Sequence, residues 1–150
     1  QNHSILMLWK KLSRMQSLSN MSKNLIDTNL IIRFLVNDDP QKVKRVERLL
    51  QNTANKNILL DTVVAEIVWV LSSYYSLNKK EVIEKVTALI HVATIECNTF
   101  LLSRALTIWE EHAISYIDAY VGAVAELGNM ILYSYDRKLK TIDTITVSEP

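Results

Sequence analysis

Glycine and cysteine are nearly absent from this sequence, and each scarcity excludes a class of protein. The 150 residues contain two glycines, Gly122 and Gly128, and one cysteine, Cys97. Two isolated glycines exclude the glycine-rich loops that cradle phosphates in nucleotide-binding proteins. A single cysteine excludes an intrachain disulfide and fits a reducing compartment, so we expect a cytoplasmic protein.

The sequence also lacks a strong net charge and an uninterrupted apolar run. Its net charge is +1, so any nucleic-acid binding must come from local basic patches rather than from a bulk basic field. The most apolar stretch, residues 57–75, contains Asp61 and Glu66, which argues against a membrane span. With 49% hydrophobic and 22% charged residues, the chain has the composition of one globular domain.

The first twenty residues are expected to stand apart from this domain, which then comprises residues 21–150. Met21 begins a stretch typical of a natural start, and apolar residues precede it at helical spacing, at Ile5, Leu8, Leu12 and Met15. A signal peptide fits poorly, because the basic residues follow the apolar ones. One interpretation is an N-terminal extension from cloning or an upstream reading frame. The other is an amphipathic segment that docks on a partner or on the domain.

Apolar periodicity predicts strands that alternate with helices. We expect strands at residues 24–26, 58–60, 94–96, 130–134 and 145–147. We expect helices at residues 29–36, 41–51, 79–92, 99–111 and 117–127, and one capped by Asp61 or Thr62 that runs to about residue 74. Such alternation indicates an α/β fold with a central parallel sheet of four to five strands covered by helices.

Four carboxylates lie within or directly after segments that are otherwise typical of a buried core: Asp27, Glu66, Asp118 and Asp136. Asp27 and Asp136 follow predicted strands, and sites in open parallel sheets form at the carboxyl ends of strands. Asp118 and Glu66 lie near the starts of their predicted helices. We therefore expect the four acids to converge at one edge of the sheet.

Convergence of like charges requires a compensating cation. Two carboxylates about 4 Å apart repel by about 4 kcal/mol at an effective dielectric constant near 20. A bound divalent metal reverses this repulsion, and ligands that are all oxygen favour Mg²⁺ or Mn²⁺ over Zn²⁺. Such ions activate water and stabilise the charge on a phosphodiester under attack.

Each of the four acids also has a purely structural interpretation. Asp27 and Asp118 are suited to the capping of a helix, and Asp136 is suited to a turn. Glu66 fits an ordinary position between core and solvent. The joint pattern of four acids favours a metal site over four separate structural roles.

Short motifs around these acids, taken in order, resemble those of PIN-domain ribonucleases of the VapC toxin family. They are Leu25-Ile26-Asp27-Thr28-Asn29 with Asp38-Asp39-Pro40 after it, then Val64-Ala65-Glu66, Asp118-Ala119 and Ser134-Tyr135-Asp136. The resemblance covers residues 24–147. Ser115 stands where some members carry a further acid, which we expect to weaken a second metal site more than the first.

The resemblance implies a three-layer α/β/α sandwich and a Mg²⁺- or Mn²⁺-dependent endoribonuclease. It also implies a toxin with a cognate antitoxin protein and a homodimeric assembly. Its metal ligands would be Asp27, Asp118 and Asp136, while Glu66 would be a ligand or would orient the attacking water. Side chains that hold these carboxylates in place would be Thr28, Asn29 and Ser134. The alternatives are a PIN nuclease that processes RNA without an antitoxin, and an inactive PIN scaffold that binds a protein partner.

Basic and aromatic residues give weaker indications. Arg33, Arg137 and Lys138 lie nearest the four acids in the sequence and are the candidates for contacts with RNA phosphates. The cations of residues 42–48 are more typical of a solvated helix face. The aromatic residues are expected in the core or on a dimer surface rather than as base-stacking platforms: Trp69, Tyr74, Tyr75 and Trp109.

Overall fold

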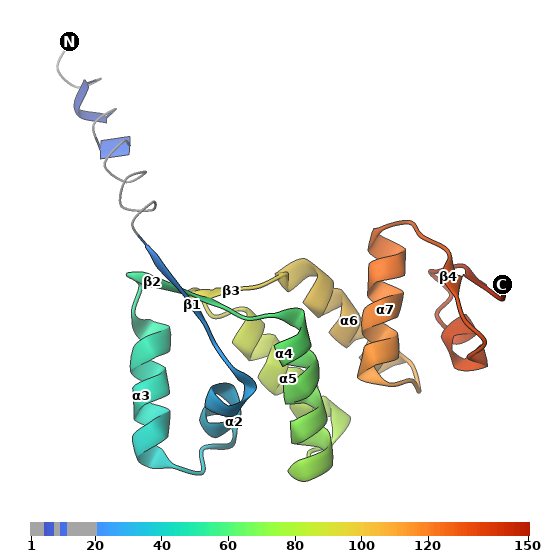
Figure 1. The fold of residues 1–150 in the computed structure, drawn as a ribbon, viewed down its shortest axis with the longest axis horizontal. Coiled ribbons are helices and arrows are strands. Elements are labelled where there is room, and N and C mark those ends of the chain that lie inside the picture. Colours follow the sequence, from blue (N-terminus) through green and yellow to red (C-terminus); the bar gives the residue numbers. More distant parts are fainter. Residues whose placement is uncertain (1–4, 8–9, 12–20) are drawn as a thin grey trace.

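The computed structural model of this chain describes residues 5–7, 10–11 and 21–150 (Figure 1). Its strands are β1 (Ser22–Leu25), β2 (Asn55–Ile58), β3 (Ile95–Glu96), β4 (Leu132–Tyr133) and β5 (Val147–Ser148). Its α-helices are α2 (Thr28–Val36), α3 (Pro40–Gln51), α4 (Asp61–Trp69), α5 (Lys79–Ile90), α6 (Thr99–Glu111) and α7 (Tyr116–Leu127). A π-helical turn, η1 (Val70–Tyr74), continues α4, and a 3-10 turn, η2 (Arg137–Thr141), follows β4. The predicted docking of the N-terminal segment falls largely outside the described residues.

Local capping explains why the helices begin where the sequence predicts. Asn78 accepts a hydrogen bond from the backbone of Glu81, and the Glu81 side chain accepts one from the backbone of Asn78, so α5 begins with a capping box. Asp39 caps α3, and Pro40 occupies its first turn. Strand β2 lies a few residues earlier than the predicted strand at residues 58–60. Leu59 follows the end of β2, and its backbone N–H donates to the carbonyl of Glu96 at 3.0 Å, so pairing with β3 continues there.

The strands form two parallel sheets instead of the single predicted sheet of four to five strands. In the first sheet the order is β1-β2-β3, with Leu25 opposite Ile58 and Ile58 opposite Glu96. The second sheet pairs β4 with β5, where the backbone N–H of Leu132 donates to Thr146 at 2.9 Å. The α/β class and the parallel pairing are confirmed, whereas the prediction that β4 and β5 join the first sheet is wrong. A strand of two residues carries too short a pattern to specify its partner.

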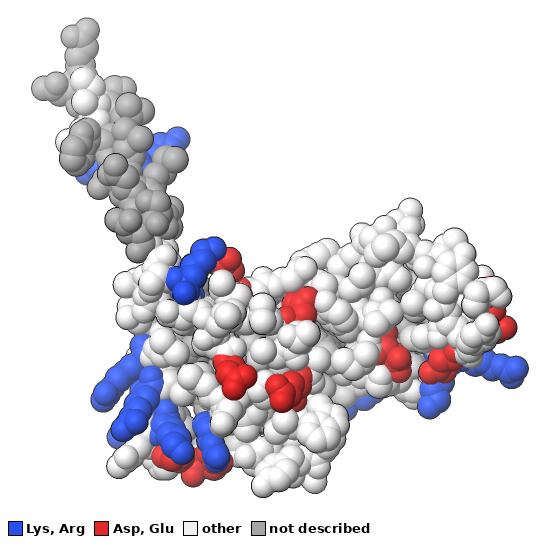
Figure 2. Space-filling view, in the orientation of Figure 1, with Lys and Arg blue, Asp and Glu red and all other residues white. Residues whose placement is uncertain are grey.

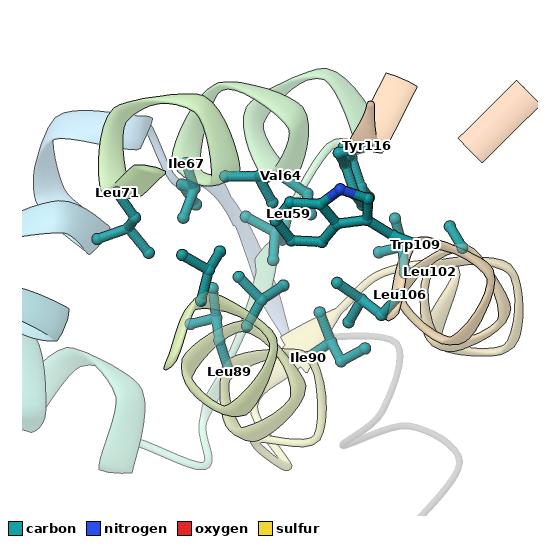
Figure 3. Close-up of a cluster of buried hydrophobic side chains, with 14 of the residues drawn as sticks. Leu59, Val64, Ile67, Leu71, Leu89, Ile90, Leu102, Leu106, Trp109 and Tyr116 are labelled. Atoms are coloured by element: carbon teal, nitrogen blue, oxygen red, sulfur yellow. The ribbon is translucent and has the colours of Figure 1, made fainter. Parts of the chain in front are cut away.

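The core lies around the three-stranded sheet (Figure 3). Leu59, which follows β2, lies between the α4 side chains Val64 and Ile67 and the α5 side chain Leu89. Each of these side chains is at most 2% exposed. Buried side chains of α2, α3, α4 and α5 all belong to this one cluster, so helices cover the sheet as the sequence implies.

Helices α6 and α7 pack on each other and extend this core toward the C-terminus (Figure 1). Trp109 of α6 is 7% exposed, which confirms the core prediction for this residue. Its ring meets that of Tyr116, the first residue of α7, edge to face with 5.8 Å between the ring centroids. Among the described residues, no helix is long and apolar enough to cross a membrane.

Candidate active site

Asp27 stands at the carboxyl end of β1, where the chain turns into α2. The preceding residue, Ile26, is 4% exposed, and its backbone N–H donates to Ile58 at 3.2 Å, so the strand end is fixed against β2. Asp27 occupies the N-cap position of α2, yet its side chain makes no capping hydrogen bond. The capping interpretation of Asp27 is therefore wrong for this structure, and its exposed carboxylate remains available to bind a ligand.

Glu66 is held beside Asp27 by the first residue of α2. Thr28 is 6% exposed, and its hydroxyl Oγ1 donates to Oε2 of Glu66 at 2.5 Å. This contact links α2 to α4 and fixes one carboxylate oxygen of Glu66, while the side chain remains at the surface. A carboxylate held by a neighbouring hydroxyl is preorganised, because less rotamer entropy is lost when it binds a ligand.

An open pocket of about 590 Å³ joins these residues. Asp27 and Glu66 both line it, and so do Asn29 and Arg33 of α2. Arg33 is paired with Asp38 at 2.5 Å, and both side chains are partly exposed. The pocket therefore brings together three carboxylates, of which Asp38 is paired with the one cation, and a polar amide. Its complete lining is Asp27, Thr28, Asn29, Ile32, Arg33, Asp38, Glu66, Trp69, Val70, Tyr74 and Tyr75.

The other two predicted acids do not join this pocket. Within the part of the chain that the structure describes, no group of three or more His, Cys, Asp or Glu side chains could hold a metal ion. The predicted convergence of four acids is therefore absent from this structure. For Asp136 the physical reason is that β4 pairs with β5 and not with the sheet that contains β1.

Asp118 instead forms the capping box of α7. Its Oδ2 accepts hydrogen bonds from the Ser115 hydroxyl at 2.7 Å and from the Ser115 backbone at 3.3 Å. Its own backbone N–H donates to the Ser115 hydroxyl at 3.1 Å. The helix-capping interpretation is thus confirmed for Asp118, and its role as a metal ligand stays a prediction.

Asp136 caps the 3-10 turn η2. Its Oδ1 accepts from the backbone N–H of Lys138 at 2.9 Å, and the Ser134 hydroxyl accepts from the backbone N–H of Asp136 at 3.0 Å. Ser134 thus holds the backbone of Asp136 rather than its carboxylate. Arg137 and Lys138 begin η2 and do not line the pocket of Asp27.

Of the two positions predicted for Trp69 and Tyr74, the core or a dimer surface, the structure excludes the core. Trp69 is 65% exposed and Tyr74 is 78% exposed, so neither belongs to the core. Trp69 follows Glu66 by three residues and therefore shares its helix face, which is the one sequence signal for its position. Tyr74 lies on the π-helical turn, which the apolar periodicity does not reveal.

A hydrogen bond between side chains of α4 and α7 is also not predictable from the sequence. The Tyr120 hydroxyl donates to Oδ2 of Asp61 at 2.5 Å. This hydrogen bond to a carboxylate, together with burial and the nearby charge of Asp61, raises the pKa of Tyr120 to about 12. The interaction fixes the start of α4 against α7, away from the pocket of Asp27.

Asp27 at the carboxyl end of β1 and Glu66 on α4 thus form an acidic pocket in an α/β fold, with two of the four predicted acids. In a comparison with known protein families, the model of the PIN domain matches residues 25–145. The chain therefore belongs to the PIN-domain family, whose members are generally metal-dependent nucleases.

Among solved structures, the chain is similar to one in the crystal structure of VapBC2 from Rickettsia felis bound to a DNA fragment from their promoter. The identity is 19% and the TM-score is 0.37, over 85% of this chain and 98% of the other. The search of curated proteins finds no match.

Proposed function

We propose that this protein is a metal-dependent endoribonuclease whose active site is the pocket at the end of β1. The observation that carries the proposal is the pairing of two exposed carboxylates, Asp27 and Glu66, in one pocket of a PIN domain. Thr28 holds the second carboxylate from the helix that Asp27 begins. Two exposed carboxylates that share one pocket with an arginine and a polar amide favour a functional interpretation.

The donors of the pocket fit Mg²⁺ or Mn²⁺. They are all oxygen atoms, from the carboxylates of Asp27 and Glu66 and from the side-chain amide of Asn29. Mg²⁺ in nucleases and polymerases is commonly held by one or two carboxylates together with water and substrate phosphate. A pair of protein acids is therefore a sufficient donor set for such an ion. When bound, the ion stabilises negative charge on the phosphodiester and supports the attack of water.

Three residues of the pocket would then have separate roles in the hydrolysis of RNA. Asp27 holds the metal. Glu66 is fixed through one oxygen by Thr28, and its other oxygen orients the attacking water or contributes to the metal site. Arg33, which lines the same pocket, contacts a phosphate oxygen of the RNA.

Asp118 and Asp136 belong to the proposed site through their motifs. Each of these carboxylates makes its hydrogen bonds through one oxygen, Oδ2 of Asp118 to Ser115 and Oδ1 of Asp136 to Lys138, so the other oxygen could bind a metal once the side chain reaches the pocket. We propose that Asp118 is a ligand of the same metal and that Asp136 completes the acidic set. Arg137 and Lys138 would then approach the RNA together with Asp136.

The biological setting of the proposal rests on the motif resemblance. We propose a cytoplasmic toxin of a toxin–antitoxin pair, active as a homodimer and neutralised by a cognate antitoxin protein. A PIN nuclease that processes RNA without an antitoxin would use the same pocket. An inactive scaffold would bind a protein but leave RNA intact, and the exposed acidic pair argues against it.

The proposal is tested by incubating the protein with total RNA, with Mn²⁺ and with EDTA. We expect cleavage with Mn²⁺ and none with EDTA. Glu66→Gln should lose the activity, whereas Glu110→Gln, which changes an exposed acid on α6 outside the pocket, should retain it. Equal cleavage by the Glu66→Gln protein and the native protein would refute the proposed site.

A further inference from the structure

Exposed aromatic rings form one wall of the acidic pocket. Trp69 is 65% exposed and Tyr74 is 78% exposed, and both line the pocket together with Asp27 and Glu66. Burial of a large apolar ring is favourable, so a ring held at the surface beside a polar site has area left to cover with a ligand. We call Trp69, Tyr74 and Tyr75 the aromatic wall.

The π-helical turn places these rings on one side of the helix. The backbone N–H of Tyr75 donates to Val70, five residues earlier, at 3.2 Å. In a regular α-helix, residues five apart differ by about 140° around the axis, which would turn Tyr74 away from Trp69. The wider turn of η1 instead lets Tyr74 line the same pocket as Trp69. Isolated π turns within helices often occur at functional sites.

The aromatic wall is anchored on the core. Tyr75 is partly buried against the hydrophobic core, and its ring meets that of Tyr74 edge to face, with centroids 4.9 Å apart. Ser76 then adopts a left-handed conformation, with φ of 54°, and ends the helix. A ring supported in this way loses little conformational entropy when a flat ligand stacks on it.

Cations continue from the pocket onto α3. A second hollow of about 470 Å³ shares Asp27, Asn29 and Arg33 with the acidic pocket and is also lined by Lys42 and Arg45. Figure 2 shows Lys and Arg side chains gathered over α3, beside acidic side chains that lie over the region between α2 and α4. The acids thus lie between an aromatic wall and a basic surface.

We infer that the aromatic wall stacks on an unpaired base of single-stranded RNA, while the adjoining phosphates run over Arg33 toward Lys42 and Arg45. The inference rests on the proposed function and adds to it the residues that hold the bases and phosphates of the substrate strand. Aromatic rings recognise the faces of bases, and cations recognise phosphates, so the pocket matches both parts of a nucleotide strand. In a duplex the base faces are covered by their neighbours, and the aromatic wall has no ring to contact.

The test is direct binding of a fluorescein-labelled single-stranded RNA of twelve nucleotides, followed by anisotropy in EDTA, with RNA integrity checked on a gel. Trp69→Ala and Tyr74→Ala should each weaken binding about tenfold, within the range that stacked aromatic residues contribute. The matched control is Phe100→Ala, since Phe100 is a 74% exposed aromatic residue on α6 that does not line the pocket, and it should leave the affinity unchanged. The same RNA annealed to its complement should bind at least tenfold more weakly.

Two further measurements separate stacking from charge. The slope of log Kd against log salt concentration should stay the same in Trp69→Ala and become shallower in Lys42→Gln and Arg45→Gln, because only the latter remove phosphate contacts. Trp69→Phe should retain most of the affinity, since a phenyl ring also stacks. Loss of affinity in Trp69→Phe as large as in Trp69→Ala would contradict a stacking role.

Unchanged RNA affinity in both Trp69→Ala and Tyr74→Ala would overturn the inference and would assign the aromatic wall to a protein partner instead. This outcome is distinct from a failure of the proposed nuclease. If cleavage persists while both variants bind normally, the nuclease stands and the stacking inference fails. If no cleavage is found but binding depends on Trp69, the stacking inference stands and the nuclease fails.

Discussion

Asp27 and Asp118 both stand at the start of a helix, and the fold uses their carboxylates in opposite ways. Asp27 makes no capping hydrogen bond and lines an open pocket beside Glu66. Asp118 accepts two hydrogen bonds from Ser115 and stabilises the first turn of α7. The comparison teaches that motif position alone does not reveal whether an acid serves chemistry or local structure. What distinguishes them is whether the fold leaves the carboxylate without a partner.

The largest expected effect is on catalysis and comes from Asp27→Asn. A metal ion contributes several kcal/mol to such a reaction, so loss of its ligand should slow cleavage at least about a hundredfold. The free energy of unfolding should change by less than about 0.5 kcal/mol, because no capping hydrogen bond is lost. Initial rates on labelled RNA with Mn²⁺, and urea denaturation of the same samples, measure the two effects. A variant that cleaves at the native rate would remove Asp27 from the site.

Thr28→Val is expected to have the next largest effect. It removes the hydroxyl that holds Glu66 while nearly conserving side-chain volume, and the loss of such a supporting contact costs about ten- to a hundredfold in activity. Thr28→Ser restores a hydroxyl and should recover most of the rate. If both variants were equally impaired, the effect would come from packing and not from the hydrogen bond to Glu66.

Metal should stabilise the native protein through Asp27. At a Mn²⁺ concentration of about 100 times Kd, the free energy of unfolding should rise by about 2.7 kcal/mol relative to EDTA, provided that the unfolded chain does not bind the ion. Asp27→Asn should abolish this increase. Thermal melts of both proteins in EDTA and in Mn²⁺ measure it, and equal melting temperatures of the native protein under the two conditions would count against a preformed site. Loss of the increase in Asp118→Asn as well would show that Asp118 also binds the metal.

The free energy of unfolding should depend more on Asp118 than on Asp27, which reverses the order expected for catalysis. Asp118→Ala removes the capping box of α7 and should cost about 1 kcal/mol, whereas Asp27→Ala should cost little. Ser115→Ala removes the other half of the box and provides an independent check. Equal costs for Asp27→Ala and Asp118→Ala in urea denaturation would show that the contrast between the two positions does not hold in solution.

The smallest expected effect is the alkaline behaviour of Tyr120. Its pKa is raised from 10.0 to about 12, so its hydrogen bond to Asp61 contributes stability that is complete below pH 10 and is lost as the pH rises toward 12. The native protein should therefore exceed Tyr120→Phe in stability by a constant amount below pH 10. The difference should shrink between pH 10 and 12. A difference independent of pH over this range would show that Asp61 does not hold the phenol.

The sequence predicts the local features of this fold well. The start of α5 is visible in Asn78 and Glu81, and the bounds of α6 follow from its apolar spacing, because capping and periodicity act over a few residues. The partner of β4 is not visible in the sequence. A strand of two residues carries no pattern that distinguishes β1 from β5, so the predicted single sheet was wrong.

In the candidate site, too, the sequence predicts the features that depend on local pattern and misses those that depend on tertiary structure. Strand-end reasoning finds Asp27, and the position near the start of a predicted helix finds Glu66, since both depend on local pattern and on one parallel pairing. The capped state of Asp118 was foreseen only as an alternative. The aromatic wall was missed, because the π turn that brings Tyr74 beside Trp69 breaks the periodicity from which positions on a helix are inferred.

Direct titration with Mn²⁺, followed by the electron paramagnetic resonance signal of the free ion, tests the central claim most directly. Mn²⁺ bound to protein loses the sharp signal of the hydrated ion, so binding is counted without any assay of activity. We predict that the native protein and Glu110→Gln bind Mn²⁺ equally and that Asp27→Asn loses this binding, while Glu66→Gln shows whether the free oxygen of Glu66 is also a ligand. Retention of native Mn²⁺ affinity by Asp27→Asn would contradict a metal site at the end of β1.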